Sequence, residues 1–371
     1  MSDDELPEAD RAEGAPHPRE TTQFFGHEAI EADVATALSG ERMHHAWLLT
    51  GPKGIGKATL AWRMARFLMA AEPAVAGMFG DLPAEPPSRL DIDPDHPVLR
   101  RIAALSDPRC LSIRRAWDHD RKRLKTQITV EEVRKLNTFF GLSATDGGHR
   151  VVIVDSADEM NPSAANALLK VLEEPPKGAV LILISHQPAR LLPTIRSRCR
   201  VLRMSELAPD AMENALTAAQ IDFGSNPALV ELANGSVGSA IRLQSESGLK
   251  LYANIMQVIG TAPSMDRQRL AKLVDHIAAR SADTRLELSV NLLDLALTRM
   301  ARAAAGVFPK AEACAGETEV LTRLASGPGR AQLWASLQQK LSARITHGRG
   351  VNIDAASLMT DAFLQINEAA R

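Results

Sequence analysis

Apolar runs alternate with helical patterns through the first half of the chain, and only helical patterns follow. Five short apolar runs, each bounded by polar or turn residues, have the length and composition of buried strands. They cover residues 46–50, 111–114, 151–155, 180–185 and 201–204. Because helical stretches separate them, the pattern from about residue 22 to residue 204 predicts a parallel sheet covered by helices.

Two of the intervening helices have clear start signals. Thr129 and Glu132 have the spacing of a capping box and predict a helix that runs to about Phe140. Asn161 followed by Pro162 predicts an N-cap and a first helical residue, and Pro175 with Pro176 ends that helix. Between the first two strands, seven of the 21 prolines fall in residues 73–108, which predicts a long irregular loop.

The pattern divides the chain into a tail and three domains. Residues 1–20 are acidic and contain proline but no apolar core, which indicates a disordered tail on a cytoplasmic protein and neither a signal nor a transit peptide. Residues 21–205 form the α/β domain. After it, residues 206–265 are typical of a small helical domain, and residues 266–371 of a second one with a long amphipathic run at 286–303.

Composition excludes several classes of protein. No stretch of about 18 apolar residues exists, so no membrane span is expected. The 43 basic and 45 acidic residues nearly balance, which argues against a protein that grips nucleic acid alone. The three cysteines are far apart and odd in number, which argues against a disulfide framework and against a four-cysteine zinc site.

The segment from Gly51 to Lys57 has the G-x-x-x-x-G-K spacing of a phosphate-binding loop, between a predicted strand and a predicted helix. Ala58 stands where that motif carries a Mg²⁺-binding Ser or Thr, and Thr59 lies about 100° further round the helix. The alternative is a glycine turn that merely caps a helix. The candidate nucleotide contacts are Gly51, Pro52, Lys53, Gly54, Ile55, Gly56, Lys57, Ala58 and Thr59, with Asp155 from a later strand.

Asp155 ends the apolar run VVIVD, where a P-loop fold holds a carboxylate for Mg²⁺. Its alternative role is to cap the helix that follows a buried strand. Many hydrolytic P-loop proteins place Glu next to this carboxylate to orient water, and here the residue is Ser156. We therefore expect ATP or ADP to bind with weak Mg²⁺ or none, and hydrolysis to be absent.

Four segments together carry a family resemblance: GPKGIGK, ITVEEVRKLNTFF, VVIVDSADEMNPSAANALLKVLEEPP and the triplet Ser197-Arg198-Cys199. From about Phe24 to Arg203 the chain resembles the delta-prime subunits of the bacterial DNA polymerase III clamp loader, which belong to the AAA+ superfamily. The resemblance implies an AAA+ core, a helical lid and a helical collar. It implies a ring of five with tau or gamma and delta subunits, which loads the sliding clamp on primer-template DNA. Arg198 would act in trans as a finger on the ATP of a neighbouring subunit.

The chain departs from the family pattern at two places. Many relatives carry a four-cysteine zinc module between the P-loop and the VVIVD strand, but here that interval holds Cys110 alone with scattered His96, His119 and His149, so no zinc is expected. Gly238 stands where ATPase subunits carry the sensor 2 Arg, and Arg242 one turn further serves packing or solvent. A third feature, the basic segment 114–125, is interpreted as a solvated loop, with DNA contact as the alternative.

The resemblance implies a subunit of the DNA polymerase III holoenzyme, a DNA-directed DNA polymerase, that lends Arg198 to its neighbour. The residues at positions 58 and 156 predict that it does not hydrolyse ATP itself. An independently active AAA+ ATPase of replication or repair is the first alternative, against which Ala58 and Ser156 argue. A structural scaffold whose P-loop is a relic is the second.

Overall fold

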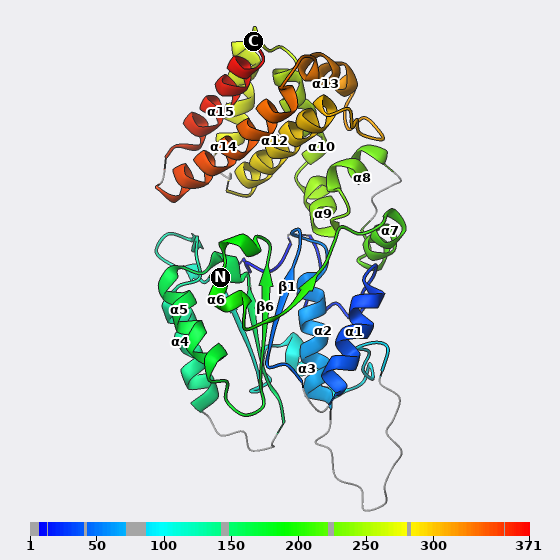
Figure 1. Ribbon diagram of the computed structural model, residues 1–371, viewed down its shortest axis with the longest axis vertical. Coiled ribbons are helices and arrows are strands. Elements are labelled where there is room, and N and C mark those ends of the chain that lie inside the picture. Colours follow the sequence, from blue (N-terminus) through cyan, green and yellow to red (C-terminus); the bar gives the residue numbers. More distant parts are fainter. Residues whose placement is uncertain are drawn as a thin grey trace, which may run out of the picture. The chain divides into compact units, whose positions relative to one another are not determined.

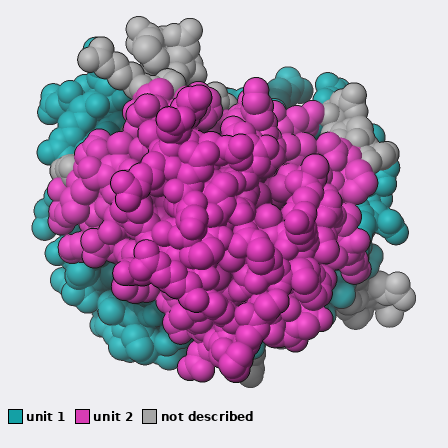
Figure 2. Space-filling model, turned by 90° about the horizontal axis from the view of Figure 1, so that it is seen from above, with its two compact units in different colours: residues 1–221, 235–238 teal, residues 222–234, 239–371 magenta. Residues whose placement is uncertain are grey.

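The computed structural model describes residues 7–12, 14–40, 43–71, 87–141, 148–221, 226–279, 283–351 and 353–371. It divides into two compact units, which Figure 2 colours separately. Unit 1 contains Met1–Ile221 and Gly235–Gly238, and unit 2 contains Asp222–Asn234 and Ser239–Arg371. The described residues thus cluster in two units where three domains were expected after the tail.

Unit 1 is built on a five-stranded parallel sheet in the order β2-β5-β6-β1-β7. All five predicted strands are present, and their ends lie within one residue of the predicted ones. The three inner strands are buried along their whole length, which explains their unbroken apolar sequences. The strands are β1 (Ala46–Thr50), β2 (Cys110–Arg114), β5 (Arg150–Asp155), β6 (Ala179–Ser185) and β7 (Arg200–Arg203).

Helices cover both faces of this sheet (Figure 1). Helices α4 and α5 pack on one face around a core that includes Leu136 and Leu168, and α1, α2 and α3 lie over the other. The prediction of a parallel sheet between helical layers is confirmed. The helices of this unit are α1 (Glu28–Ser39), α2 (Lys57–Ala70), α3 (Pro97–Ala103), α4 (Val130–Gly141), α5 (Pro162–Glu173), α6 (Pro193–Arg196) and α7 (Pro209–Ala218), with 3₁₀ turns at Ala157–Glu159 and Pro188–Arg190.

The predicted helix starts are confirmed. Helix α4 begins at Val130, and Asn161 Oδ1 accepts the N–H of Ala164 at 2.8 Å to cap α5. The proline-rich insert was predicted as an irregular loop, and this is wrong for one part of it. His96 caps a helix there, α3, whose first residue is Pro97. Residues 72–86 of the insert lie outside the described part of the chain.

The basic segment 114–125, interpreted from the sequence as a solvated loop, contains a short hairpin whose residues 119–122 are exposed. Strands β3 (Trp117–Asp118) and β4 (Arg123–Leu124) pair antiparallel, and Asp118 Oδ1 accepts the N–H of Arg121 at 3.0 Å to close the turn. Arg115 Nε lies 2.8 Å from Glu159 Oε2. DNA contact by this hairpin stays untested.

The N-terminal tail is a further correction. Residues 1–6 and 13 lie outside the described part. Residues 7–12 and 14–20 were predicted to be disordered, but they pack within unit 1. His17 is fully buried, and Ala15 is nearly so. Two buried arginines of α2, Arg63 and Arg66, donate to the carbonyls of Thr22 and Thr21 respectively. Sequence reasoning missed this because acidic composition alone cannot reveal buried partners.

Unit 2 is entirely helical in the residues described. Helix α12 packs along α14, and α11 along α15 (Figure 1). A buried network links three of its helices: Glu317 Oε1 accepts from Tyr252 Oη at 2.5 Å and from Arg299 Nε at 2.8 Å. The helices are α8 (Pro227–Ala233), α9 (Val237–Ser245, which begins in unit 1), α10 (Gly248–Ile259), α11 (Arg267–Ala278), α12 (Asp283–Ala304), α13 (Glu317–Ala325), α14 (Arg330–Gly350) and α15 (Ala355–Ala369).

The boundaries of the expected helical domains differ from those of the two units. Helix α7 clusters with the sheet, and the helices from α8 onward cluster together. A separate lid at 206–265 and collar at 266–371 stay predictions. None of the described helices combines the length and hydrophobicity that a membrane crossing requires.

Candidate functional site

The P-loop has the strand, loop and helix context that the sequence predicted. It connects β1 to α2, and Gly51, Gly54 and Gly56 have φ values of +143°, +81° and +101°. Only glycine adopts such angles without strain. A Cβ at Gly51 would also lie 2.2 Å from the carbonyl oxygen of Met204. The glycines are therefore required by the shape of this loop, as the motif predicts.

The P-loop lysine is turned toward its own loop. Lys57 Nζ donates to the carbonyl of Gly51 at 2.7 Å and to that of Pro52. Burial lowers the pKa of Lys57 to about 8, although the carboxylates of Asp155 and Asp158 oppose the shift. A phosphate that binds in this loop has to replace two carbonyl contacts of the ammonium.

The remaining predicted loop residues differ in exposure. Pro52 and Lys53 are exposed, Ile55 is buried, and Ala58 and Thr59 are half-buried in the first turn of α2. The methyl side chain of Ala58 offers Mg²⁺ no ligand, as the sequence indicated.

The crest of the loop is held by residues 235–238 of the same unit. Ser236 Oγ donates to the carbonyl of Lys53 at 2.8 Å, and the N–H of Gly238 donates to the carbonyl of Gly54 at 3.0 Å. A Cβ at Gly238 would lie 2.9 Å from Gly54 Cα. This contact gives a physical reason why no arginine stands at position 238.

Arg242, the other basic residue of this region, belongs to unit 2. Its Nη1 lies 3.5 Å from Glu287 Oε1, so its predicted role in packing is supported.

Asp155 lies at the carboxyl end of β5 and is buried with Ser156. Ser156 Oγ lies 2.9 Å from Asp155 Oδ1, to which it donates, and 3.0 Å from His186 Nε2. The backbone N–H of His186 donates to Asp158 Oδ1 at 2.9 Å. The position of the water-orienting Glu is thus occupied by a hydroxyl that bonds its neighbours.

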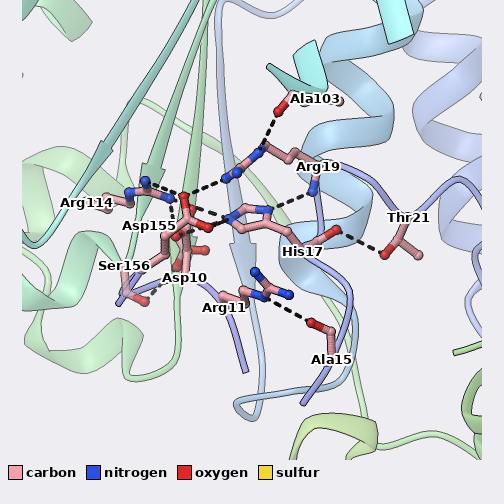
Figure 3. A network of polar contacts seen from close by, with 11 residues as sticks. Asp10, Arg11, Ala15, His17, Arg19, Thr21, Ala103, Arg114, Asp155 and Ser156 are labelled. Carbon is pink, nitrogen blue, oxygen red and sulfur yellow. Dashed lines mark hydrogen bonds and ion pairs between the residues drawn. The ribbon is translucent and has the colours of Figure 1, made fainter. Parts of the chain in front are cut away.

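Burial raises the pKa of Asp155 to about 7, and the carboxylate of Asp10 adds to the shift. Figure 3 shows Asp10 beside Asp155, with His17 and Arg114 around them. Sequence reasoning missed all three of these neighbours. One signal could have drawn attention to the N-terminal segment. Arg63 and Arg66 are two cations about one turn apart in residues 60–70 of α2, which are otherwise apolar.

The residues fit a phosphate better than a Mg²⁺–nucleotide. Backbone amides of a glycine loop at the start of α2 are the groups that bind phosphate. The groups that would bind Mg²⁺ are deficient in two ways. Position 58 has no hydroxyl, and burial raises the pKa of the Asp155 carboxyl to about 7. Among the described residues, no three His, Cys, Asp or Glu side chains converge as a metal site requires. The absence of zinc stays a prediction.

A hollow of about 480 Å³ opens beside the first residues of the loop, at the carboxyl ends of β1, β6 and β7. Its lining residues are Thr50, Gly51, Pro52, His186, Pro188, Arg203 and Met204. It adjoins the P-loop but does not include Gly54 to Lys57, so it is not the phosphate cradle.

Arg198 lies two residues after the end of α6 and is remote in sequence from the P-loop. Its side chain is 36% exposed, Nη1 donates to the carbonyl of Thr194 at 3.0 Å, and Nη2 lies 2.8 Å from Glu173 Oε1. Cys199 is packed against the core, and burial raises its pKa to about 12. The triplet therefore has a structural Cys and an accessible Arg.

Comparisons with known proteins agree with these features. A family model described as DNA polymerase III, delta subunit, matches residues 26–208. The delta-prime subunit of Pseudomonas aeruginosa is 37% identical over 235 residues, which are 63% of this chain and 65% of that protein. The delta-prime subunit of Escherichia coli K12 is 29% identical over 275 residues, 73% of this chain and 74% of that protein.

Two further proteins are also similar to this chain. The gamma/tau subunit of Mycobacterium tuberculosis H37Rv is 30% identical over 199 residues, 54% of this chain and 31% of that protein. A gamma subunit-related protein of Thermotoga maritima has 16% identity and a TM-score of 0.42, over 92% of this chain and all (100%) of that chain. The matched region spans 65% of the P. aeruginosa relative and 56% of the Bacillus subtilis relative, less than two thirds of either.

The predicted resemblance is thereby confirmed over the α/β core, where the P-loop, the VVIVD strand and the Ser197-Arg198-Cys199 triplet lie. Over this core the chain is similar to the delta-prime subunits of bacterial DNA polymerase III.

Proposed function

We propose that the chain is a clamp-loader subunit that supplies Arg198 to an ATP site on a neighbouring subunit. The observation that carries this proposal is the accessibility of Arg198, which is 36% exposed and held by groups on the surface. A guanidinium stabilises charge on transferring phosphoryl oxygens and is worth 10³- to 10⁵-fold in other NTPases. Its partners would be tau or gamma and delta subunits in a ring of five, together with the sliding clamp and primer-template DNA, and its compartment the cytoplasm.

The chain's own P-loop has a supporting role in this proposal. It binds ATP or ADP through backbone amides and Lys57, with Mg²⁺ held weakly or not at all. Ala58 and Ser156 argue against hydrolysis, and so does the pKa of about 7 at Asp155. These features argue against an independently active ATPase. A steady-state ATP hydrolysis assay on the isolated chain distinguishes the two functions.

A scaffold with a relic P-loop is the second candidate function. The contacts of Lys57 Nζ with the carbonyls of Gly51 and Pro52 favour it, because the ammonium is satisfied without phosphate. Nucleotide binding measured with and without Mg²⁺ separates this scaffold from the nucleotide-binding subunit.

Reconstitution tests the proposal as a whole. The chain is combined with the tau and delta subunits of its own organism, and loading of the sliding clamp onto primed DNA is measured. Loading that requires the chain supports the proposal, and equal loading without it contradicts the proposal.

A further inference from the structure

The N-terminal segment, residues 8–22 apart from residue 13, is fastened to α2, the helix that follows the P-loop. The ring of His17 meets that of Trp62 edge-on, with 6.3 Å between centroids. Arg66 donates to the carbonyl of Thr21 at 2.6 Å and to that of Arg19 at 3.2 Å. Because buried guanidinium groups are costly without acceptors, these carbonyls give the segment a defined path along the helix.

The acidic residues at the start of the segment form ion pairs with Arg114, the last residue of β2. Glu8 Oε1 accepts from Arg114 Nη2 at 2.7 Å and from Arg19 Nη1 at 2.8 Å, and Asp10 Oδ1 accepts from Arg114 Nη1. His17 Nδ1 accepts the backbone N–H of Arg19 at 3.0 Å. The proton of a neutral His17 therefore sits on Nε2, which lies 3.3 Å from Asp10 Oδ1 and donates to it.

The contacts of Glu8 and Asp10 with Arg114 lie at the carboxyl ends of the strands, next to Asp155. Arg114 is paired in register with Asp155, so Glu8 and Asp10 reach the carboxyl ends of β2 and β5, where parallel sheets bind ligands. The side chain of Asp10 is 1% exposed, and its Oδ2 is buried without a hydrogen-bond partner. Figure 3 shows Asp10 at Asp155.

The carboxyl of Asp10 is already paired with a cation of the chain itself. Burial works against ionisation of Asp10, but His17 and Arg114 hold the pKa of its carboxyl below the usual range. Arg114 Nη1 already donates to Asp10 Oδ1, so opening this place requires the pair to separate. A carboxyl already paired with a guanidinium in this way is a poor ligand for Mg²⁺.

We propose that residues 8–12 and 14–22 form an intramolecular plug that closes the carboxyl end of β5, at Asp155, against Mg²⁺–nucleotide until Glu8 and Asp10 leave Arg114. The plug rests on the proposed nucleotide site and deepens it, because it adds a closed state with which nucleotide competes. A ligand that binds only the open state has its apparent affinity reduced by the closed fraction.

Affinity of the full chain for a fluorescent ATP analogue, with Mg²⁺ present, tests the plug. The double variant Glu8→Gln with Asp10→Asn weakens both contacts with Arg114 and should bind about tenfold more tightly or better. Arg114→Gln releases the same acids from the other side and should act in the same direction. Glu20→Gln is the matched control, because Glu20 is an exposed acid of the same segment and its variant should bind like the wild type.

Limited trypsin digestion gives a second readout that does not depend on the variants. Arg11 lies within the plug, where its Nε donates to the carbonyl of Ala15 at 3.0 Å. Saturating Mg²⁺–ATP should speed cleavage after Arg11 in the wild-type chain, because nucleotide displaces the plug.

Three results would overturn the plug. Weaker binding of the ATP analogue by the double variant would indicate that Glu8 and Asp10 help to bind Mg²⁺. A lower melting temperature with unchanged affinity would leave the segment a packing element. If neither the wild type nor the variants bind nucleotide at millimolar concentration, nucleotide does not compete with the plug. None of these results bears on Arg198, whose trans role is measured by clamp loading.

Discussion

Arg198 and Glu173 form an ion pair on the surface of unit 1, with Nη2 2.8 Å from Oε1. The two side chains are 36% and 49% exposed, so solvent screens the attraction. Exposed pairs of this kind contribute about 0–1 kcal/mol. Arg198 can therefore leave Glu173 for a phosphate on another chain at little cost.

Glu173→Gln tests whether the pair matters. Because the pair is exposed, the variant should lose less than about 1 kcal/mol of unfolding free energy. ATP hydrolysis by the reconstituted loader should stay at or above the wild-type rate, since the finger no longer has to leave a carboxylate. A clear loss of hydrolysis, with the variant fully folded, would instead make Glu173 a positioning residue for Arg198.

The isolated chain should hydrolyse ATP negligibly. Ala58 leaves Mg²⁺ one protein ligand short, and the Ser156 hydroxyl is bonded to Asp155 and His186 where Glu would orient water. Phosphate release by the purified chain, with and without primed DNA, checks this. DNA-stimulated turnover that Lys57→Ala abolishes would contradict it.

Gly238→Ala should destabilise the chain by about 1–3 kcal/mol. The added Cβ would lie 2.9 Å from Gly54 Cα, and that neighbour is backbone, which cannot rotate away. Gly350→Ala at the end of α14 is the control, because a Cβ there meets nothing within 4 Å. Urea unfolding of both variants measures the difference. Equal stabilities would show that the contact of residue 238 with the P-loop is loose.

Asp155 should make stability fall as pH rises toward neutrality. Its pKa is raised from 3.8 to about 7, so the folded chain binds this proton more tightly than the unfolded chain. The contribution is complete below about pH 4 and is lost as pH rises to about 7, with a slope of at most about 1.4 kcal/mol per pH unit.

Asp155→Asn removes this titration. Relative to the variant, the wild type should lose unfolding free energy between about pH 5 and pH 7, by urea denaturation at each pH. Parallel pH profiles for the two proteins would mean that Asp155 is ionised in the fold.

The sequence predicted those parts of the fold whose signals are local. Strands such as residues 46–50 are continuous apolar runs because the sheet buries them on both faces. Asn161 and Pro162 mark a helix start because capping involves only neighbouring residues. The glycines of the P-loop could likewise be predicted, since their spacing encodes the backbone shape itself.

The features that the sequence could not predict depend on distant partners. Asp10 lies 104 residues from Arg114, and Ser236 lies 183 residues from Lys53, so no local pattern connects them. An acidic segment is predicted to be solvent-exposed unless the arginines with which it forms ion pairs are known. The orientation of Lys57 toward its own loop carbonyls is equally invisible, because the motif is the same whether the ammonium meets phosphate or backbone.

The central claim is that Arg198 acts on the ATP of a neighbouring subunit, and variants at two arginines test it in the assembled loader. Arg198→Ala should fold and join the ring, because its side chain is partly exposed and outside the core. Arg196, which is exposed two residues away, is the control for a general basic patch. Arg198→Lys should rescue little, since an ammonium lacks the planar fork that meets two oxygens.

The most direct measurement is the rate of DNA- and clamp-stimulated ATP hydrolysis by the loader reconstituted with each variant, with ring assembly checked in parallel. The account predicts that Arg198→Ala lowers this rate by about tenfold or more at the affected site while Arg196→Ala leaves it near the wild-type value. Equal effects at both positions, or a fully active loader that carries Arg198→Ala, would contradict the trans finger.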